Sequence, residues 1–201
     1  MIARINIVVV TAVVAMFVAG TAHADTLVNI DATTVTPNNF TTAESGGDNL
    51  WRVRDETGNG FLGDDIIEAH ETEDAPELTM TVDVTADLEG PGLYDVFLRF
   101  VMPASFGQDN HGAAGAIGSD PLIEFVGGPS GGATQIAPFG PWNAYEGDLG
   151  TVFSSSTISV RMDHSGPQRN WLESVRFSLI PEPTTLGLTA VGALLMLRRR
   201  R

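Results

Sequence analysis

The feature that most constrains the fold is a strict alternation of apolar and polar residues from Leu78 to Val84. A period of two indicates a half-buried β-strand, because successive side chains of a strand point to opposite faces of its sheet. Similar short segments recur along the chain, separated by stretches rich in Gly, Pro, Asn and Ser. No amphipathic helix of useful length is evident between residues 25 and 180. The pattern predicts an all-β fold, an antiparallel two-sheet sandwich of the jelly-roll type.

The same criterion places the individual strands. We expect strands at residues 27–30, 50–54, 78–84, 93–102, 122–126, 157–163 and 171–180. Ile66–Ala69 is either a short strand or a helical turn. We expect loops at residues 33–47, 55–65, 103–119 and 127–150. Leu93–Met102 carries apolar residues on both faces, which indicates a central strand covered on both sides.

The chain ends in three features that follow one another directly: Pro181-Glu182-Pro183, an uncharged run from Thr184 to Leu197, and Arg198, Arg199, Arg200 and Arg201. An apolar run followed by arginines predicts a C-terminal membrane helix with the arginines in the cytoplasm and the preceding chain outside. The run is short, at about 21 Å of helix against about 30 Å of hydrocarbon. The alternative is a buried C-terminal helix of a soluble domain.

This tail resembles the PEP-CTERM sorting signal in the order and spacing of its three parts. The resemblance implies that an exosortase, an integral-membrane enzyme of Gram-negative bacteria that make extracellular polysaccharide, recognises and cuts the tail. The protein would then be an exosortase substrate, transiently anchored in the membrane and delivered to the cell surface or the extracellular matrix. The signal implies where the protein goes and nothing about what its main domain does.

The N-terminus agrees with export. Arg4 precedes the apolar run Ile5–Gly20, and Ala22-His23-Ala24 fits the cleavage pattern of a secretory signal peptide. We therefore expect the Sec translocon and signal peptidase as partners, with an uncleaved anchor as the alternative. The expected organisation is a signal peptide at 1–24, a β-sandwich domain at 25–180 and a sorting tail at 181–201.

The charge of the chain excludes one class of partner. It has 25 acidic and 11 basic residues, a net charge of −14, and its basic residues are all arginines. Nucleic-acid binding depends on neutralising phosphates with Arg and Lys, so we expect none. Divalent cations are the natural counter-ions, although acidity also keeps a secreted protein soluble. The absence of cysteine excludes disulfides and thiol chemistry.

A second resemblance covers residues 78–179. A strand with Gly92, Tyr94, Val96 and Arg99, and a last strand that begins Trp171-Leu-Glu-Ser-Val, look like the closing strands of galactose-binding-like jelly rolls. Family 6-type carbohydrate-binding modules are the nearest comparison. The resemblance implies sugar binding through aromatic rings, with a calcium ion elsewhere, and maps no residue onto those sites.

Two sets of residues are candidate binding sites. Trp142 and Tyr145 fall in an expected loop, where they either stack on a sugar ring or fold back over the end of the sandwich. The acidic loop after Arg54 lacks the Glu that an EF-hand requires at its twelfth position. It still offers oxygen ligands for calcium in another geometry, or else it is a solvated loop. These candidate calcium ligands are Asp55, Asn59, Asp64 and Asp65.

No catalytic motif is present, so we expect no catalytic residue. Glu146 with Asp148, or Glu124 with Asp163, would suit a glycosidase, but carboxylate pairs are expected by chance in so acidic a chain. The sequence therefore favours a non-catalytic surface or matrix protein that binds polysaccharide. The alternatives are a small extracellular polysaccharide-acting enzyme, such as a glycosidase or lyase, and a purely structural matrix or adhesive protein.

Overall fold

Strands make up nearly all of the regular secondary structure in the part of the chain that the structure describes. The computed structural model describes residues 24–37, 40, 51–69, 75–104, 112–126, 132–163 and 170–181. Asp25–Leu179 forms one compact unit. The expected signal peptide up to His23, together with Glu182, Pro183, the expected membrane helix and the arginine cluster, lies outside the described residues. Within the described ranges, no helix is both long enough and apolar enough to cross a membrane.

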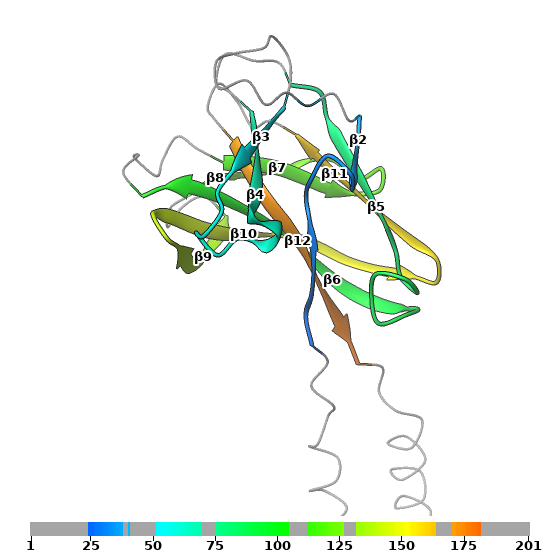
Figure 1. The fold of residues 1–201 in the computed structure, drawn as a ribbon. Coiled ribbons are helices and arrows are strands. Elements are labelled where there is room, and N and C mark those ends of the chain that lie inside the picture. Colours follow the sequence, from blue (N-terminus) through cyan, green and yellow to red (C-terminus); the bar gives the residue numbers. More distant parts are fainter. Residues whose placement is uncertain are drawn as a thin grey trace, which may run out of the picture. The chain divides into compact units, whose positions relative to one another are not determined.

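The elements are short at the start of the chain and long at its end (Figure 1). They are β1 (Thr26–Asn29), β2 (Val35–Thr36), β3 (Arg52–Asp55), the 3-10 turn η1 (Leu62–Asp64), β4 (Asp65–Ala69), β5 (Leu78–Asp83), β6 (Gly92–Pro103), β7 (Gly112–Ile117), β8 (Ile123–Val126), β9 (Ala133–Phe139), β10 (Trp142–Ser154), β11 (Thr157–Asp163) and β12 (Asn170–Ile180).

These strands form two sheets. Sheet A has the order β3-β4-β12-β6-β10-β9, with β1 also paired to β12, and sheet B has the order β2-β5-β11-β7-β8. From β5 onward the chain changes sheet repeatedly: β5 lies in sheet B, β6 in A, β7 in B, β10 in A, β11 in B and β12 in A. The prediction of an all-β, antiparallel two-sheet sandwich of the jelly-roll type is confirmed.

The core lies between the two sheets. The alternation of Leu78–Asp83 buries Leu78, Met80 and Val82 and exposes Thr81 and Asp83. Residues of β6 with even numbers, from Tyr94 to Phe100, are likewise buried. The period of two in the sequence therefore matches the structure, in which one side of each of these strands faces the core.

Four strands were not expected. β2 falls in the predicted loop 33–47, β7 in the predicted loop 103–119, and β9 and most of β10 in the predicted loop 127–150, so these loop predictions are wrong over those residues. β10 is one of the two longest strands and pairs with β6 over almost its whole length. Ile66–Ala69, for which a strand and a helical turn were both open, belongs to β4.

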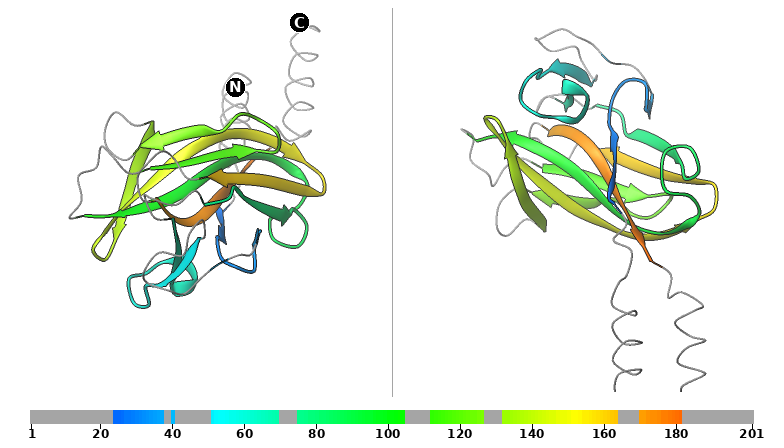
Figure 2. Two further views of the ribbon diagram at one scale, coloured as in Figure 1. Left: turned by 90° about the horizontal axis from the view of Figure 1, so that it is seen from above. Right: turned by 60° about the horizontal axis from the view of Figure 1, so that its bottom comes forward.

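The β3–β4 pair continues sheet A beyond β12. It lies toward the outer face of that sheet, which is the face away from sheet B (Figure 2). Its connecting segment, residues 56–64, reaches back over the start of β10, because Phe61 packs against Trp142 with ring centroids 6.1 Å apart. The outer face of sheet A is therefore covered at one end. The remaining part of that face carries the candidate site.

Candidate functional site

The pairing of β6 with β10 defines which residues share the outer face of sheet A. Ala144 lies opposite Val101, Glu146 opposite Arg99, and Asp148 opposite Phe97. A bulge at 148–150 then shifts the register by one residue, so that Thr151 faces Asp95 and Phe153 faces Leu93. We call the part of this face beyond Val101 and Ala144 the outer strip. It consists of Leu93, Asp95, Phe97 and Arg99 of β6, Glu146, Asp148, Thr151 and Phe153 of β10, and Arg176 of β12.

The outer strip is most exposed at the end where β6 begins. Phe153 is 63% exposed, the highest value of any large hydrophobic residue in the described chain, and its cross-strand partner Leu93 is 36% exposed. At the other end Val101 and Ala144 are buried. From Leu93 to Arg99 the outer strip extends for about 20 Å, which is longer than one sugar ring.

A group of charged side chains occupies the middle of the outer strip. Glu146 accepts a hydrogen bond of 2.7 Å from Nε of Arg99 and bonds of 2.9 and 2.8 Å from Nε and Nη2 of Arg176. Arg176 also donates to Asp25 at 3.1 Å. Burial by itself would raise the pKa of Glu146, but the hydrogen bonds and charges of the two arginines outweigh it and hold that pKa below its ordinary value.

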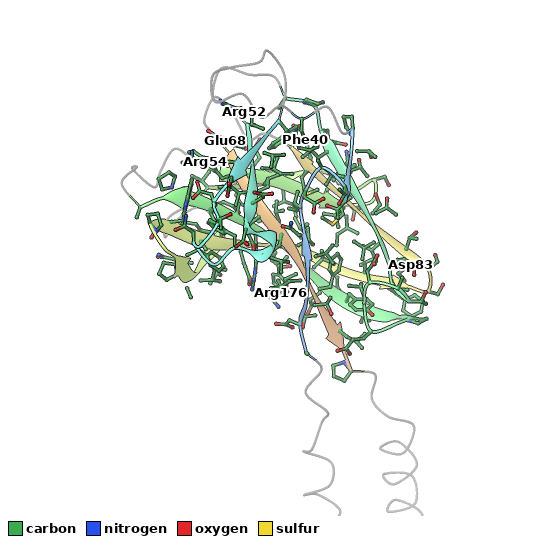
Figure 3. All side chains as sticks on the ribbon, viewed as in Figure 1. Phe40, Arg52, Arg54, Glu68, Asp83 and Arg176 are labelled. Carbon is green, nitrogen blue, oxygen red and sulfur yellow. The ribbon has the colours of Figure 1, made fainter. Side chains whose placement is uncertain are left out.

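Two further contacts order the side chains of the outer strip. The guanidinium of Arg176 lies 3.9 Å from the ring centroid of Phe97, so this ring is covered by a cation. The hydroxyl of Thr151 donates to Oδ1 of Asp95 at 2.6 Å. Phe153 is consequently the aromatic ring of the outer strip that is left open, and a preoriented carboxylate lies diagonally across from it. Figure 3 shows Arg176 on β12.

The covered end of the face contains an aromatic cluster. Phe61 contacts Phe139 and Trp142, and Trp142 contacts Trp171 at 5.7 Å between ring centroids. The indole Nε1 of Trp142 donates to buried Glu56 at 3.1 Å, and the Arg54 guanidinium lies 5.1 Å from the Trp142 ring centroid.

Arg54 also donates to Glu56 through Nε and lies 3.7 Å from a Glu68 oxygen. Figure 3 shows Arg52, Arg54 and Glu68 together on β3 and β4. Aromatic contacts and ion pairs thus fix the β3–β4 connection onto sheet A.

The expected loop with an exposed Trp142 and Tyr145 does not exist. Both residues lie on β10, Trp142 at 3% exposure in the aromatic cluster and Tyr145 at 1% in the core, where its ring stacks on Phe100. The loop prediction is wrong here because Pro141 and Gly140 form only a tight turn between β9 and β10. Neither ring is accessible for a sugar to stack on.

Sequence reasoning missed Phe153. The signal that could have found it is Gly150, a residue with a positive φ of 100° at the bulge, three positions earlier. A glycine inside a strand pattern indicates such a bulge. With the phase shifted by one residue after Gly150, Phe153 joins the same face as Glu146 and Asp148.

The calcium candidates come together only in part. Asp55 and Asp65 are cross-strand partners on β3 and β4, with Asp64 next in sequence, whereas the side-chain amide of Asn59 donates to Glu56 at 2.7 Å. Burial raises the pKa of Asp65, and the negative charges of Asp55, Asp64 and Asp31 raise it further. In the described ranges no group of three or more His, Cys, Asp or Glu side chains is arranged to hold a metal ion. Calcium binding stays a prediction.

The remaining sequence candidates are dispersed. Glu146 is held by arginines, and Oδ1 of Asp148 accepts from the Gly150 amide at 2.8 Å. Glu124 is an exposed residue of sheet B, and Asp163 is the last residue of β11. Of the expected sorting motif Pro181, Glu182 and Pro183, only Pro181 is described, as an exposed residue directly after β12.

Comparisons with known proteins find similar folds at low similarity. No protein-family model matches the chain, and no curated protein matches it. An exo-β-1,3-galactanase from Phanerochaete chrysosporium aligns with 77% of this chain at 13% identity and a TM-score of 0.45. The GH26-CBM35 β-(1,4)-mannanase of Podospora anserina aligns with 80% of this chain at 14% identity and a TM-score of 0.45. The CBM35 from Cellvibrio japonicus Abf62 aligns with 77% of this chain at 14% identity and a TM-score of 0.43. The chain spans 29% of each of the two enzymes and 92% of the CBM35. These values are too low to transfer a ligand or an activity.

Proposed function

We propose that this protein is an exported, non-catalytic polysaccharide-binding protein, and that the outer strip is its binding face. The observation that carries the proposal is the exposed ring of Phe153 beside Leu93, at the exposed end of a sheet face that is lined with fixed polar groups. Binding sites for small molecules and sugars typically combine apolar surface with a few precisely held polar groups. The outer strip has both.

The chemistry of a sugar fits these two kinds of group. One face of a sugar ring presents C–H groups, which can lie on the flat ring of Phe153 and remove apolar surface from water. Its hydroxyls are donors that carboxylates such as Asp95 and Asp148 accept. Because the Thr151 hydroxyl already holds Asp95 in place, little side-chain freedom is lost when a ligand binds.

The state of Glu146 supports a binding role over a catalytic one. A glycosidase needs one carboxyl group that donates a proton and therefore has a raised pKa. The pKa of Glu146 is lowered, because Arg176 and Arg99 stabilise its charged form. Glu146 is suited to keep the two arginines in place and is poorly suited to act as an acid.

Delivery to the outside is the second part of the proposal. It is supported by the resemblance of residues 181–201 to a PEP-CTERM signal and by the signal-peptide pattern of residues 1–24. Exosortase, the Sec translocon and signal peptidase are the partners this implies. The expected destination is the cell surface or the extracellular matrix, where extracellular polysaccharide is present.

The test is affinity electrophoresis of the full-length chain, kept in a polyoxyethylene detergent that carries no sugar, through gels containing neutral, acidic or amine-bearing polysaccharides. We expect some of them to retard the protein. Phe153→Ala should weaken the affinity for those polysaccharides at least tenfold, or by about 1.4 kcal/mol. Because Phe153 is exposed, its loss should change the free energy of unfolding by less than about 0.5 kcal/mol.

The matched control is Ile123→Ala, which removes an exposed apolar residue from sheet B and should leave binding unchanged. Wild-type binding in Phe153→Ala would rule out the outer strip as the site. No retardation of folded wild-type protein by any glycan would rule out the binding function and favour a structural matrix protein. Release of saccharide that a single carboxylate substitution abolishes would establish an enzyme instead.

A further inference from the structure

The charges of the outer strip are not balanced. Its two basic residues, Arg99 and Arg176, both donate to Glu146, and Arg176 also donates to Asp25. These positive charges are neutralised within the protein. Asp95 and Asp148 have no arginine partner among the residues that the structure describes. The part of the outer strip beside Phe153 is therefore negative.

The rest of the molecule adds to this local field. The chain has 25 acidic residues against 11 arginines, so its net charge is −14. A summed charge of this size repels anions and raises the concentration of cations near the surface. Polysaccharides rich in uronate or sulfate approach the outer strip against this field, whereas polymers that carry positive charge are drawn to it.

The positions of Asp95 and Phe153 suit a positively charged sugar. Thr151, the cross-strand partner of Asp95, is two residues from Phe153, so the carboxylate and the ring are diagonal neighbours about 7–8 Å apart at their Cα atoms. The Thr151 hydroxyl uses Oδ1 of Asp95 and leaves Oδ2 for a further donor. A sugar ring on Phe153 would bring a substituent within reach of that oxygen. A cation beside an aromatic face is itself favoured.

We propose that the outer strip binds a polysaccharide whose sugars carry protonated amino groups, an inference that rests on the proposed polysaccharide-binding function. The ring of Phe153 takes the C–H face of an amino sugar, and Asp95 accepts a hydrogen bond from its ammonium group. Asp148, exposed at the next position along β10, supplies the negative charge for a neighbouring unit of the polymer. An N-acetylated sugar of the same backbone has no such cation and loses these contacts.

The experiment compares two oligosaccharides with one backbone, a β-linked glucosamine oligomer and its fully N-acetylated form, by isothermal titration calorimetry with the full-length protein at pH 6. We expect the amine form to bind at least tenfold more tightly. Asp95→Asn keeps the shape of the side chain and should weaken the amine form about tenfold while leaving the acetylated form unchanged. Phe153→Ala should weaken both forms.

The matched control is Glu124→Gln, which removes one negative charge from an exposed position on sheet B. It should change the affinity for the amine form by less than twofold. An equal loss in Glu124→Gln and Asp95→Asn would show attraction to the overall charge and would overturn the inference, as would equal binding of the two oligosaccharides or tighter binding of a uronate polymer. In the last two cases the polysaccharide-binding function survives. Failure of every glycan to bind would contradict the function itself.

Discussion

Glu146 receives hydrogen bonds from arginines of two different strands, Arg99 of β6 and Arg176 of β12. A carboxylate in this position joins three neighbouring strands of sheet A through their side chains as well as through their backbones. Because all three side chains are mostly buried, water competes weakly for their hydrogen bonds. The group therefore contributes to stability more than an exposed ion pair would.

We expect Glu146→Gln to lower the free energy of unfolding at pH 7 by roughly 2 kcal/mol, because it leaves Arg99 without a counter-charge and Arg176 with Asp25 alone. The pKa of Glu146 is lowered from 4.5 in the folded protein. Its contribution is therefore complete above that value and is lost as pH falls below it. The difference between wild type and Glu146→Gln should shrink when urea unfolding is repeated at progressively lower pH.

Asp148→Asn serves as the control for this series, since Asp148 is exposed and bonds to the Gly150 amide through an oxygen that Asn retains. It should behave as wild type throughout. A difference between wild type and Glu146→Gln that stays constant from pH 7 to pH 3 would contradict the role assigned to the Glu146 charge.

Single residues were the hardest features to predict from the sequence. Trp142 and Tyr145 were selected because aromatic rings in an expected loop suggest exposure, but exposure depends on strand pairing that a sequence pattern does not reveal. Phe153 was missed because a bulge at Gly150 changes the phase of the alternation. The aromatic residues were visible in the sequence, whereas the face that each one occupies was not.

At the scale of elements, β7 differs from the strands that were predicted in the size of its side chains. β5, β6, β11 and β12 are rich in large apolar residues at a period of two. β7 reads Gly-Ala-Ala-Gly-Ala-Ile, and both Gly and Ala are depleted in strands. In the structure a Cβ on Gly115 would lie 3.0 Å from both Leu98 and Leu149. Small residues are required in β7 because the opposite sheet fills the space, and a single sequence does not show this.

A similar close approach links β8 to β10. The ring of Phe125 lies over Gly147, where an added Cβ would stand 2.5 Å from Cδ2 of that ring. We expect Gly147→Ala to destabilise the fold by about 1–3 kcal/mol through overpacking. Phe125→Leu in the same chain should relieve part of the clash. The double variant should therefore lose less free energy of unfolding than the sum of the losses in the two single variants.

Thermal or urea unfolding of the two single variants and the double variant measures this coupling. Thr134→Ala on β9, an exposed cross-strand neighbour of Glu146, is the control and should change stability by less than about 0.5 kcal/mol. Strict additivity of Gly147→Ala and Phe125→Leu would contradict the packing of β8 against β10.

At the scale of the whole molecule, the excess of acidic residues opposes folding through self-repulsion. Added salt should screen this repulsion and raise the melting temperature. The calcium prediction goes further, because a bound ion would stabilise the folded state by mass action. We expect CaCl2 to raise the melting temperature by a few degrees more than NaCl of equal ionic strength.

Asp65→Asn should abolish the additional rise in melting temperature that CaCl2 gives over NaCl, because Asp65 is surrounded by the negative charges of Asp55, Asp64 and Asp31. Asp120→Asn, an exposed position beside sheet B, should keep it. Equal effects of CaCl2 and NaCl on the wild type would show that cations act by screening alone and would contradict the calcium prediction.

The place where the chain leaves sheet A has a mechanical consequence. β12 runs to Ile180 at the end of the sheet, and its neighbour β6 carries four of the nine residues of the outer strip. If a tether pulls at residue 181 while a polymer holds β6, the force runs along the strands and loads the hydrogen bonds between β12 and β6 in shear. Bonds in shear share the load and break together, whereas bonds that are peeled break one at a time. A protein anchored through its last strand would thus resist tension with many of these hydrogen bonds at once.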